Sequence, residues 1–190
     1  MRSIDVLLVG VGGQGTILAS RILAHVGQSM GYDIKVSEIH GMAQRGGSVV
    51  TQVRMGEKVF SPLIEEGTAD IILAFEKLEG LRWLSYLKPG GSMIVNDQAI
   101  YPVPVLAGLA VYPEDVTGCL SARVKDNAVV DALAIARDCG NPKAANVVLV
   151  GVLARRLPIP EEKWQEALAA RVPAKFLEVN RAAFSKGYKL

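Results

Sequence analysis

The stretch Asp5-Val6-Leu7-Leu8-Val9-Gly10-Val11-Gly12-Gly13-Gln14-Gly15-Thr16 decides the fold of this chain. Its apolar residues 6–9 predict a buried strand, and the glycines that follow predict a tight turn. Apolar residues then recur at helical spacing over 17–26, so a helix is expected to begin near Thr16. Because glycine has no Cβ, backbone N–H groups here can approach a ligand closely, and the positive end of the helix dipole points to the same place. A phosphate or pyrophosphate group would fit there.

The same turn matches the pattern G-x-G-x-x-G as Gly10, Gly12 and Gly15. Two interpretations remain open at this point. The glycines either cradle the phosphates of a nucleotide, or they only form a sharp strand-to-helix turn with close packing. Glu38, at the end of the next expected strand, has two interpretations as well. It is the acid that binds a ribose in a nicotinamide-binding fold, or a carboxylate that faces water.

Strand and helix patterns alternate along the rest of the chain. Strands are expected at 32–37, 49–55, 58–61, 70–75, 92–95 and 109–112, with 58–61 as the hairpin partner of 49–55. Helices are expected at 76–87, 124–139, 144–157 and 160–171, and from Pro173 onward.

This order predicts an α/β fold. A strand, a helix and a second strand in succession form a right-handed crossover with parallel neighbours. We therefore expect an open, doubly wound, mostly parallel sheet of the Rossmann or flavodoxin type with a C-terminal helical cover. The 190 residues are expected to form a single domain, with the sheet core in residues 1–115 and a mainly helical cover in residues 116–190.

The composition narrows the class of protein. Hydrophobic residues make up 50% of the chain, enough for a sizeable core, and the net charge is only +2. Such a balance favours neither a nucleic-acid partner nor a membrane surface. No apolar run is long enough for a transmembrane helix, and the first strand begins too early to leave room for a signal peptide. A cytoplasmic protein is expected.

The chain offers few residues for catalysis or for metal binding. Its two cysteines, Cys119 and Cys139, are far apart in the sequence and lack a neighbouring histidine, so neither an iron–sulfur cluster nor a tetrahedral zinc site is expected. The sequence contains no convincing Ser/His/Asp or Cys/His set and no G-x-x-x-x-G-K-[ST] loop. Glu76 and Asp97 could form a carboxylate pair, although acids at strand ends usually face water. No catalytic residue is therefore expected in this chain.

Residues 10–15, 38–47, 75–76 and 96–97 are all expected at the carboxyl edge of the sheet, where ligands of open α/β sheets bind. The second of these segments forms another glycine-rich loop and carries Arg45. A guanidinium group can meet a phosphate, or a carboxylate of a partner, through two parallel hydrogen bonds, and otherwise it faces solvent. Two glycine-rich loops at one edge predict an anion-binding site rather than two separate turns.

Two motifs together resemble the gamma component of 2-oxoacid:ferredoxin oxidoreductases. They are Gly10-Val11-Gly12-Gly13-Gln14-Gly15 and Gly41-Met42-Ala43-Gln44-Arg45-Gly46-Gly47-Ser48-Val49-Val50. The resemblance extends over nearly the whole chain and includes Lys143-Ala144-Ala145-Asn146 at the start of the apolar helix. It is nearest to the small subunits, called beta, of those members of the family that act on indolepyruvate.

The resemblance implies an activity for the complex rather than for this chain alone. Enzymes of this family oxidatively decarboxylate a 2-oxoacid with coenzyme A, giving an acyl-CoA, carbon dioxide and reduced ferredoxin. Thiamine diphosphate and [4Fe–4S] clusters are expected in a large alpha subunit and not here. The resemblance also implies the residues that help to bind coenzyme A or to complete the subunit interface: Gly10, Gly12, Gly13, Gln14, Gly15, Gln44, Arg45 and Gly46.

The apolar helices of residues 124–187 predict a stable complex with that large subunit, and self-association of the chain when the partner is absent. Two other functions remain open. One is a stand-alone NAD(P)- or flavin-binding oxidoreductase, indicated by Gly10, Gly12 and Gly15 together with Glu38. The other is a purely structural subunit whose glycine loops form an interface and bind nothing.

Overall fold

A single mixed sheet forms the centre of the molecule. The computed structural model describes residues 3–41 and 47–190. The strands are β1 (Ile4–Val11), β2 (Asp33–His40), β3 (Ser48–Gly56), β4 (Ala69–Ala74), β5 (Leu87–Asn96) and β6 (Asp126–Val130). Their order in the sheet is β2-β3-β1-β4-β5-β6. The pairs β1–β4, β4–β5 and β5–β6 are parallel, and β3 runs antiparallel to both β1 and β2.

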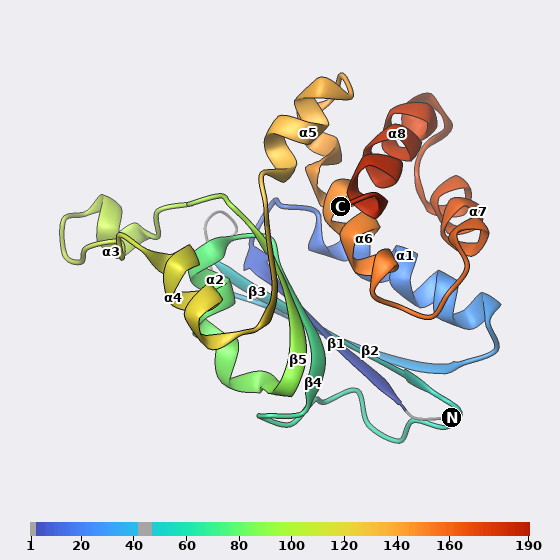
Figure 1. Ribbon diagram of the computed structural model, residues 1–190, viewed down its shortest axis with the longest axis horizontal. Helices are drawn as coiled ribbons and strands as arrows, with labels where there is room; N and C mark the ends of the chain where they lie inside the picture. The colour runs from blue at the N-terminus through green and yellow to red at the C-terminus, as the bar shows by residue number, and fades with distance from the viewer. Residues whose placement is uncertain (1–2, 42–46) are drawn as a thin grey trace.

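Helices cover both faces of this sheet (Figure 1). One face carries α1 (Thr16–Ser29), α6 (Ala145–Arg155), α7 (Glu161–Arg171) and α8 (Leu177–Tyr188); the other carries α2 (Lys77–Arg82) and α4 (Val116–Arg123). The short α3 (Val103–Leu106) lies on a segment that projects from the body, and α5 (Ala132–Asp138) precedes α6. The structure confirms the doubly wound α/β fold. No helix within the described residues has the length and apolar composition to cross a membrane.

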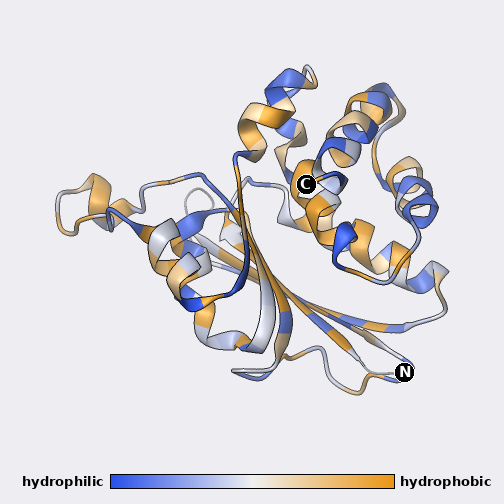
Figure 2. Cartoon of the chain, in the orientation of Figure 1, coloured by the Kyte–Doolittle hydropathy of each residue, from blue (hydrophilic) through white to orange (hydrophobic). Residues whose placement is uncertain are grey.

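The central strand β1 is buried on both faces, which explains its unbroken apolar run. Val6 and Leu8 pack in an apolar cluster with residues of α1 and α6. Leu7 and Val9 face the opposite side and pack in a second cluster with Leu120 of α4. Figure 2 shows the same distribution, with hydrophobic residues along the central strands and along α6. The core therefore lies in two layers, one on each face of the sheet.

The hairpin at the β2 edge differs from the prediction. Residues 58–61 form no strand, and β3 pairs instead with β2, placing His40 opposite Val49. The segment after β3 is held by a side chain and not by strand pairing: Asp33 Oδ2 accepts the N–H of Val59 at 2.9 Å. The alternating pattern of residues 49–55 did predict β3 correctly, but it did not identify its partner.

The sheet also extends beyond residue 115, where its boundary was expected. Residues 124–139 were expected to form one helix, but they divide into strand β6 and helix α5. The division falls at Asp131, whose carboxylate caps α5 by accepting the N–H of Ala134 at 2.9 Å. Before that cap, the β-branched Val129 and Val130 favour an extended chain. Residues 109–112, expected as a strand, are irregular.

Candidate functional site

The first glycine turn lies at the point of the sheet where consecutive connections diverge. β1 leads into α1 on one face and β4 leads into α2 on the other (Figure 1). The carboxyl ends of these two parallel strands are held together because Phe75 donates its N–H to the carbonyl of Val9 at 2.8 Å. Open α/β sheets bind their ligands at such a divergence. The turn is therefore positioned by topology to face a ligand.

Gln14 fastens this turn to the neighbouring strands. Its Oε1 accepts the N–H of Val11 at 2.9 Å, and its Nε2 donates to the carbonyl of Phe75 at 2.7 Å and to Gln98 Oε1 at 3.0 Å. Both ends of the amide are thus used inside the protein. The side chain of Gln14 thus sets the position of the turn, and Gln14 also lines the cavity described below.

Asn96 supports the same turn from the end of β5 and is only 3% exposed. Its Nδ2 donates to the carbonyl of Phe75 at 3.0 Å and to Gln98 Oε1 at 3.1 Å, while its Oδ1 accepts the N–H of Ala132 at 3.2 Å. Gln98 Oε1 therefore receives two hydrogen bonds. Within residues 3–41 and 47–190 the structure shows no partner for Gln98 Nε2, so this nitrogen remains available as a donor.

The glycines of the turn serve different purposes. Gly13 and Gly15 have φ values of +95° and +80°, a region that other residues rarely adopt. A Cβ at Gly15 would also collide with the amide of Asn146, whose Nδ2 donates to the Gly15 carbonyl at 3.3 Å. A Cβ at Gly10 would meet Gln14 Oε1 at 2.8 Å. Gly10 and Gly15 are thus required for packing, whereas Gly13 faces open space and is exposed.

The two glycine-rich loops meet, as the sequence predicted. Gly12 donates its N–H to the carbonyl of Gly47 at 3.0 Å, so the second loop returns to the first at this point. That hydrogen bond, and one from the N–H of Gln14 to the carbonyl of Val11 at 3.3 Å, occupy the backbone N–H groups of two of the predicted site residues, Gly12 and Gln14. Gln44, Arg45 and Gly46, the other predicted site residues, lie outside the residues that the structure describes.

A cavity of about 350 Å³ opens beside this turn. Its walls come from the turn (Gly12, Gly13), from the residues after β5 (Gln98, Ile100), and from the segment that starts α6 (Lys143, Asn146). Among the described residues that line it, Lys143 is the one charged side chain, and none is a carboxylate. A cavity with a cation, amide groups and no negative charge favours an anionic ligand.

The start of α1 adds further donors beside the turn. The first backbone hydrogen bond of this helix runs from the N–H of Ala19 to the carbonyl of Gly15, at 3.2 Å. In the described chain no side chain caps this end, and Gly15 stands at the N-cap in the left-handed conformation. The N–H groups of the first turn, beginning at Thr16, therefore have no partner within the helix. The positive end of the helix dipole adds to the attraction for an anion.

Glu76 and Asp97 do not form the carboxylate pair considered from the sequence. Glu76 is buried and accepts hydrogen bonds from the N–H of Glu79 at 2.8 Å and from the hydroxyl of Tyr112 at 2.6 Å. Burial, followed by the hydrogen bond to Glu76, raises the pKa of Tyr112, so its hydroxyl keeps the donated proton. Asp97 forms an ion pair with Lys77 at 3.0 Å. Both acids therefore have structural partners.

Glu38 does not lie where a nicotinamide-binding fold needs its ribose acid. That acid follows the strand beside β1, but here β3 separates β2 from β1. Glu38 lies within β2, two residues before its end, and accepts a hydrogen bond from Ser20 Oγ at 3.0 Å. His40 Nε2 lies 3.8 Å from the same carboxylate. The strand order thus removes Glu38 from the support for the nicotinamide-binding alternative, which leaves the glycine pattern alone.

The sequence did not single out Gln98 or Lys143 as site residues. Gln98 follows the predicted end of a strand, next to the segment assigned to the binding edge, so its position carried a signal. Lys143 belongs to the motif that opens the apolar helix, but only the folded chain brings that motif beside the first turn. Among the described residues, no group of His, Cys, Asp and Glu could hold a metal ion.

The chain was compared with known proteins. Residues 5–190 match the family model described as pyruvate ferredoxin/flavodoxin oxidoreductase. Over 201 aligned residues the chain is 40% identical to indolepyruvate oxidoreductase subunit IorB of Thermococcus kodakarensis, with 100% of this chain and 96% of that protein covered.

Solved structures agree with this match. The gamma subunit of keto/oxoacid ferredoxin oxidoreductase from Geobacter sulfurreducens gives a TM-score of 0.72 at 25% identity, covering 98% of this chain and 96% of that one. The 2-oxoglutarate:ferredoxin oxidoreductase from Magnetococcus marinus, solved with 2-oxoglutarate, coenzyme A and succinyl-CoA bound, gives a TM-score of 0.73 at 19% identity. It covers 100% of this chain but only 31% of that longer one, and the likeness shows the fold alone.

Proposed function

Because this chain belongs to the pyruvate ferredoxin/flavodoxin oxidoreductase family, we propose that it is the gamma-type subunit of a 2-oxoacid:ferredoxin oxidoreductase. The relative from Thermococcus kodakarensis supports indolepyruvate, or a related aryl pyruvate, as the oxoacid. The complex would join the acyl group of the oxoacid to the thiol of coenzyme A. Carbon dioxide and the thiol proton would leave, and two electrons would pass to ferredoxin.

The proposal places the redox chemistry in a large partner subunit. The cysteine count supports this division, since two cysteines cannot supply the four thiolates of a [4Fe–4S] cluster. The acids at the strand ends support it as well, because the buried Glu76 and the exposed Asp97 are both bound to structural partners. Thiamine diphosphate and the clusters would therefore belong to the partner. The free thiols Cys119 and Cys139 are compatible with the cytoplasm as the compartment.

This chain would contribute a binding surface for an anionic part of coenzyme A. The observation that carries the proposal is the cavity beside the glycine turn, whose lining, in the part of the chain that the structure describes, has Lys143 and no carboxylate. The exposed turn at Gly13 lets a phosphate approach the backbone, and Gln98 Nε2 offers a neutral donor. Arg45 would add a second charge from the other glycine loop. These groups bind and orient the substrate; none of them is asked to transfer a proton.

The enzyme reconstituted from this chain and its large subunit tests the proposal. Lys143→Ala should raise the apparent KM for coenzyme A by about ten- to a hundredfold, because the variant loses one charge-assisted hydrogen bond to the substrate. Lys143 is exposed, so folding should change by less than about 0.5 kcal/mol. The KM for the oxoacid should stay nearly constant, because that pocket belongs to the partner.

Lys125→Ala is the matched control. It removes the same charge from an exposed residue just before β6. That residue lies at the amino ends of the parallel strands, whereas the cavity lies at their carboxyl ends. If both variants change the KM for coenzyme A equally, the effect is general electrostatics and the cavity is not the site. An unchanged KM in Lys143→Ala would remove Lys143 from the site as well.

A further inference from the structure

Fifteen consecutive residues without a charged side chain, residues 99–113, form a segment that we call the arm. All of its residues are apolar, glycine, proline or tyrosine, in a chain where 21% of residues are charged. The arm leaves the body after β5, forms α3 at its tip and returns to α4. Figure 1 shows it projecting away from the sheet, and Figure 2 shows α3 as hydrophobic.

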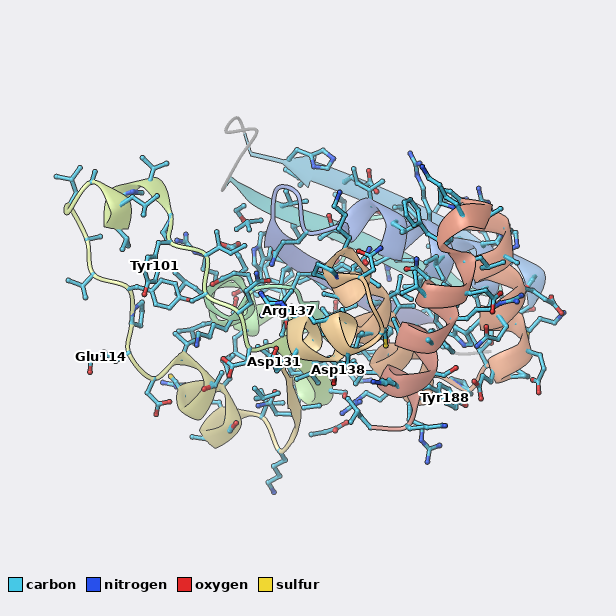
Figure 3. All side chains as sticks on the ribbon, turned by 90° about the horizontal axis from the view of Figure 1, so that it is seen from above. Tyr101, Glu114, Asp131, Arg137, Asp138 and Tyr188 are labelled. Carbon is cyan, nitrogen blue, oxygen red and sulfur yellow. The ribbon has the colours of Figure 1, made fainter. Side chains whose placement is uncertain are left out.

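The apolar side chains of the arm face solvent. The exposed fraction is 70% for Leu106, 83% for Leu109 and 88% for Val111. In Figure 3 the stretch between Tyr101 and Glu114 extends from the body with its side chains directed outward. Scattered exposed leucines are ordinary on soluble proteins, but a contiguous apolar patch of this kind marks an interaction site.

The root of the arm is fixed to the body by one buried side chain. Glu76 is 1% exposed and accepts the N–H of Ile100, where the arm begins, at 3.2 Å. It also accepts the hydroxyl of Tyr112, where the arm ends, at 2.6 Å. The rings of Tyr101 and Tyr112 lie in contact, with centroids 5.2 Å apart. The arm is therefore presented in a set direction rather than collapsed onto the nearest apolar surface.

The arm also adjoins the proposed binding cavity. Ile100, at the root, contributes to the lining of that cavity together with Gln98. A partner that covers the arm would consequently cover the side of the molecule at which the cavity opens. This is the arrangement needed if coenzyme A bound here is to reach a reaction centre in another subunit.

We propose that the arm is the element by which this chain docks into an uncharged, apolar recess of the large catalytic subunit. The inference rests on the proposed function, which supplies that partner. The charge pattern favours it over a second copy of this chain. Two hollows of the described surface have charged side chains in their lining: Lys88, Arg123 and Asp126 in one, and Glu161, Glu162 and Arg181 in the other.

The size of the arm supports the same choice. A stable interface buries about 800 Å² on each partner. Two short arms packed only against each other would leave much of each arm in water, whereas a recess encloses one arm on all sides. A protruding apolar segment is thus best covered by a concave partner.

The test introduces charges at the tip of the arm in the complex of the two subunits. Leu109→Glu combined with Val111→Glu should raise the dissociation constant of the complex at least about thirtyfold, as expected for hot-spot residues. Both positions are exposed, so the variant should keep the circular dichroism and thermal unfolding of the unmodified chain. Phe60→Glu is the control, because Phe60 is 85% exposed but lies outside the arm. It should bind the large subunit normally. Association is measured without coenzyme A.

Three results would overturn the inference. A double variant that binds the large subunit as tightly as the unmodified chain would overturn the inference and leave the proposed function intact. A chain that dimerises through the arm, and that binds the large subunit with the same affinity with and without the two substitutions, would identify a second copy of this chain as the partner that covers the arm. An unmodified chain that does not bind the large subunit at all would overturn both the inference and the proposed function.

Discussion

Glu76 and Glu79 lie three residues apart at the start of α2, and both are buried in different surroundings. Glu76 accepts hydrogen bonds from two backbone N–H groups and from the hydroxyl of Tyr112. Glu79 accepts the hydroxyl of Ser48 at 2.5 Å and forms an ion pair with Arg82 at 3.1 Å. Burial raises the pKa of Glu79 above its ordinary value, against the opposite effects of Ser48 and Arg82. The charge of Glu79 therefore costs stability.

The pH dependence of stability tests the effect of burial on the pKa of Glu79. The carboxyl of Glu79 ionises at its ordinary pKa, 4.5, in the unfolded chain and at a higher pH in the folded chain. Between these two values the folded state binds more protons, so the contribution of Glu79 to the free energy of unfolding falls as the pH rises. Glu79→Gln should remove that fall. Denaturant titrations from about pH 4.5 to neutral pH should show the variant gaining stability relative to the unmodified chain.

Glu65→Gln controls for the loss of a negative charge, since Glu65 lies exposed in the loop before β4. The difference in free energy of unfolding between this control and the unmodified chain should change little over the same pH range. A Glu79→Gln variant whose stability difference also stays constant would show that burial does not shift the titration of Glu79.

At the scale of elements, α6 and α8 pack so closely that glycine is required at their contact. A Cβ at Gly187 of α8 would collide with the carbonyl of Val148, and a Cβ at Gly151 of α6 would collide with the carbonyl of Phe184. The stacked rings of Trp164 and Phe184, with centroids 6.2 Å apart, extend this contact to α7. Because the colliding atoms belong to the backbone, neither helix can yield by a change of rotamer.

Gly187→Ala should therefore destabilise the protein by about 1–3 kcal/mol, the usual cost of overpacking a core. Gly27→Ala is the matched control within α1, since its Cβ would collide with the tip of the Ile34 side chain and make ordinary contact with Met55 Sδ, and neither is a backbone atom. The Ile34 side chain can move, and alanine favours a helix, so the control should lie within about 1 kcal/mol of the unmodified chain. Thermal and denaturant unfolding measure both. Equal stability of the two variants would contradict the close approach of α6 and α8.

The elements show which local patterns are sufficient for prediction. The unbroken apolar runs of β1 and β4 and the start of α6 were predicted because burial on both faces leaves a clear composition. The division of residues 124–139 into β6 and α5 was not predicted, because a strand of five residues gives a short signal. The strand that pairs with β3 could not be predicted from the neighbouring sequence, since the adjacent residues 58–61 and the more distant β2 are both candidates for the same edge of β3.

At the scale of the whole molecule, the site is assembled from segments that are distant in the sequence. The glycine turn was predictable from residues 10–15, whereas the structure alone shows that Gly13 and Gly15 are the two of its glycines with positive φ values. The contribution of Lys143 and Asn146 was not, because α6 reaches the turn only through the packed fold; Asn146 bonds to Gly15 across 131 residues of sequence. The hydrogen bonds of the Gln14 side chain were not predictable, because its partners, Phe75 and Gln98, are likewise brought together only by the sheet.

The most direct test of the central claim, that this chain completes an oxoacid oxidoreductase, is the reduction of ferredoxin by the separated and recombined subunits. The assay contains indolepyruvate, coenzyme A and oxidised ferredoxin, and compares this chain, the large subunit and their equimolar mixture. We predict no turnover by this chain alone, and full turnover dependent on coenzyme A only in the mixture. Turnover by this chain alone would contradict the account. So would a large subunit that works without this chain at the same rate and with the same KM for coenzyme A.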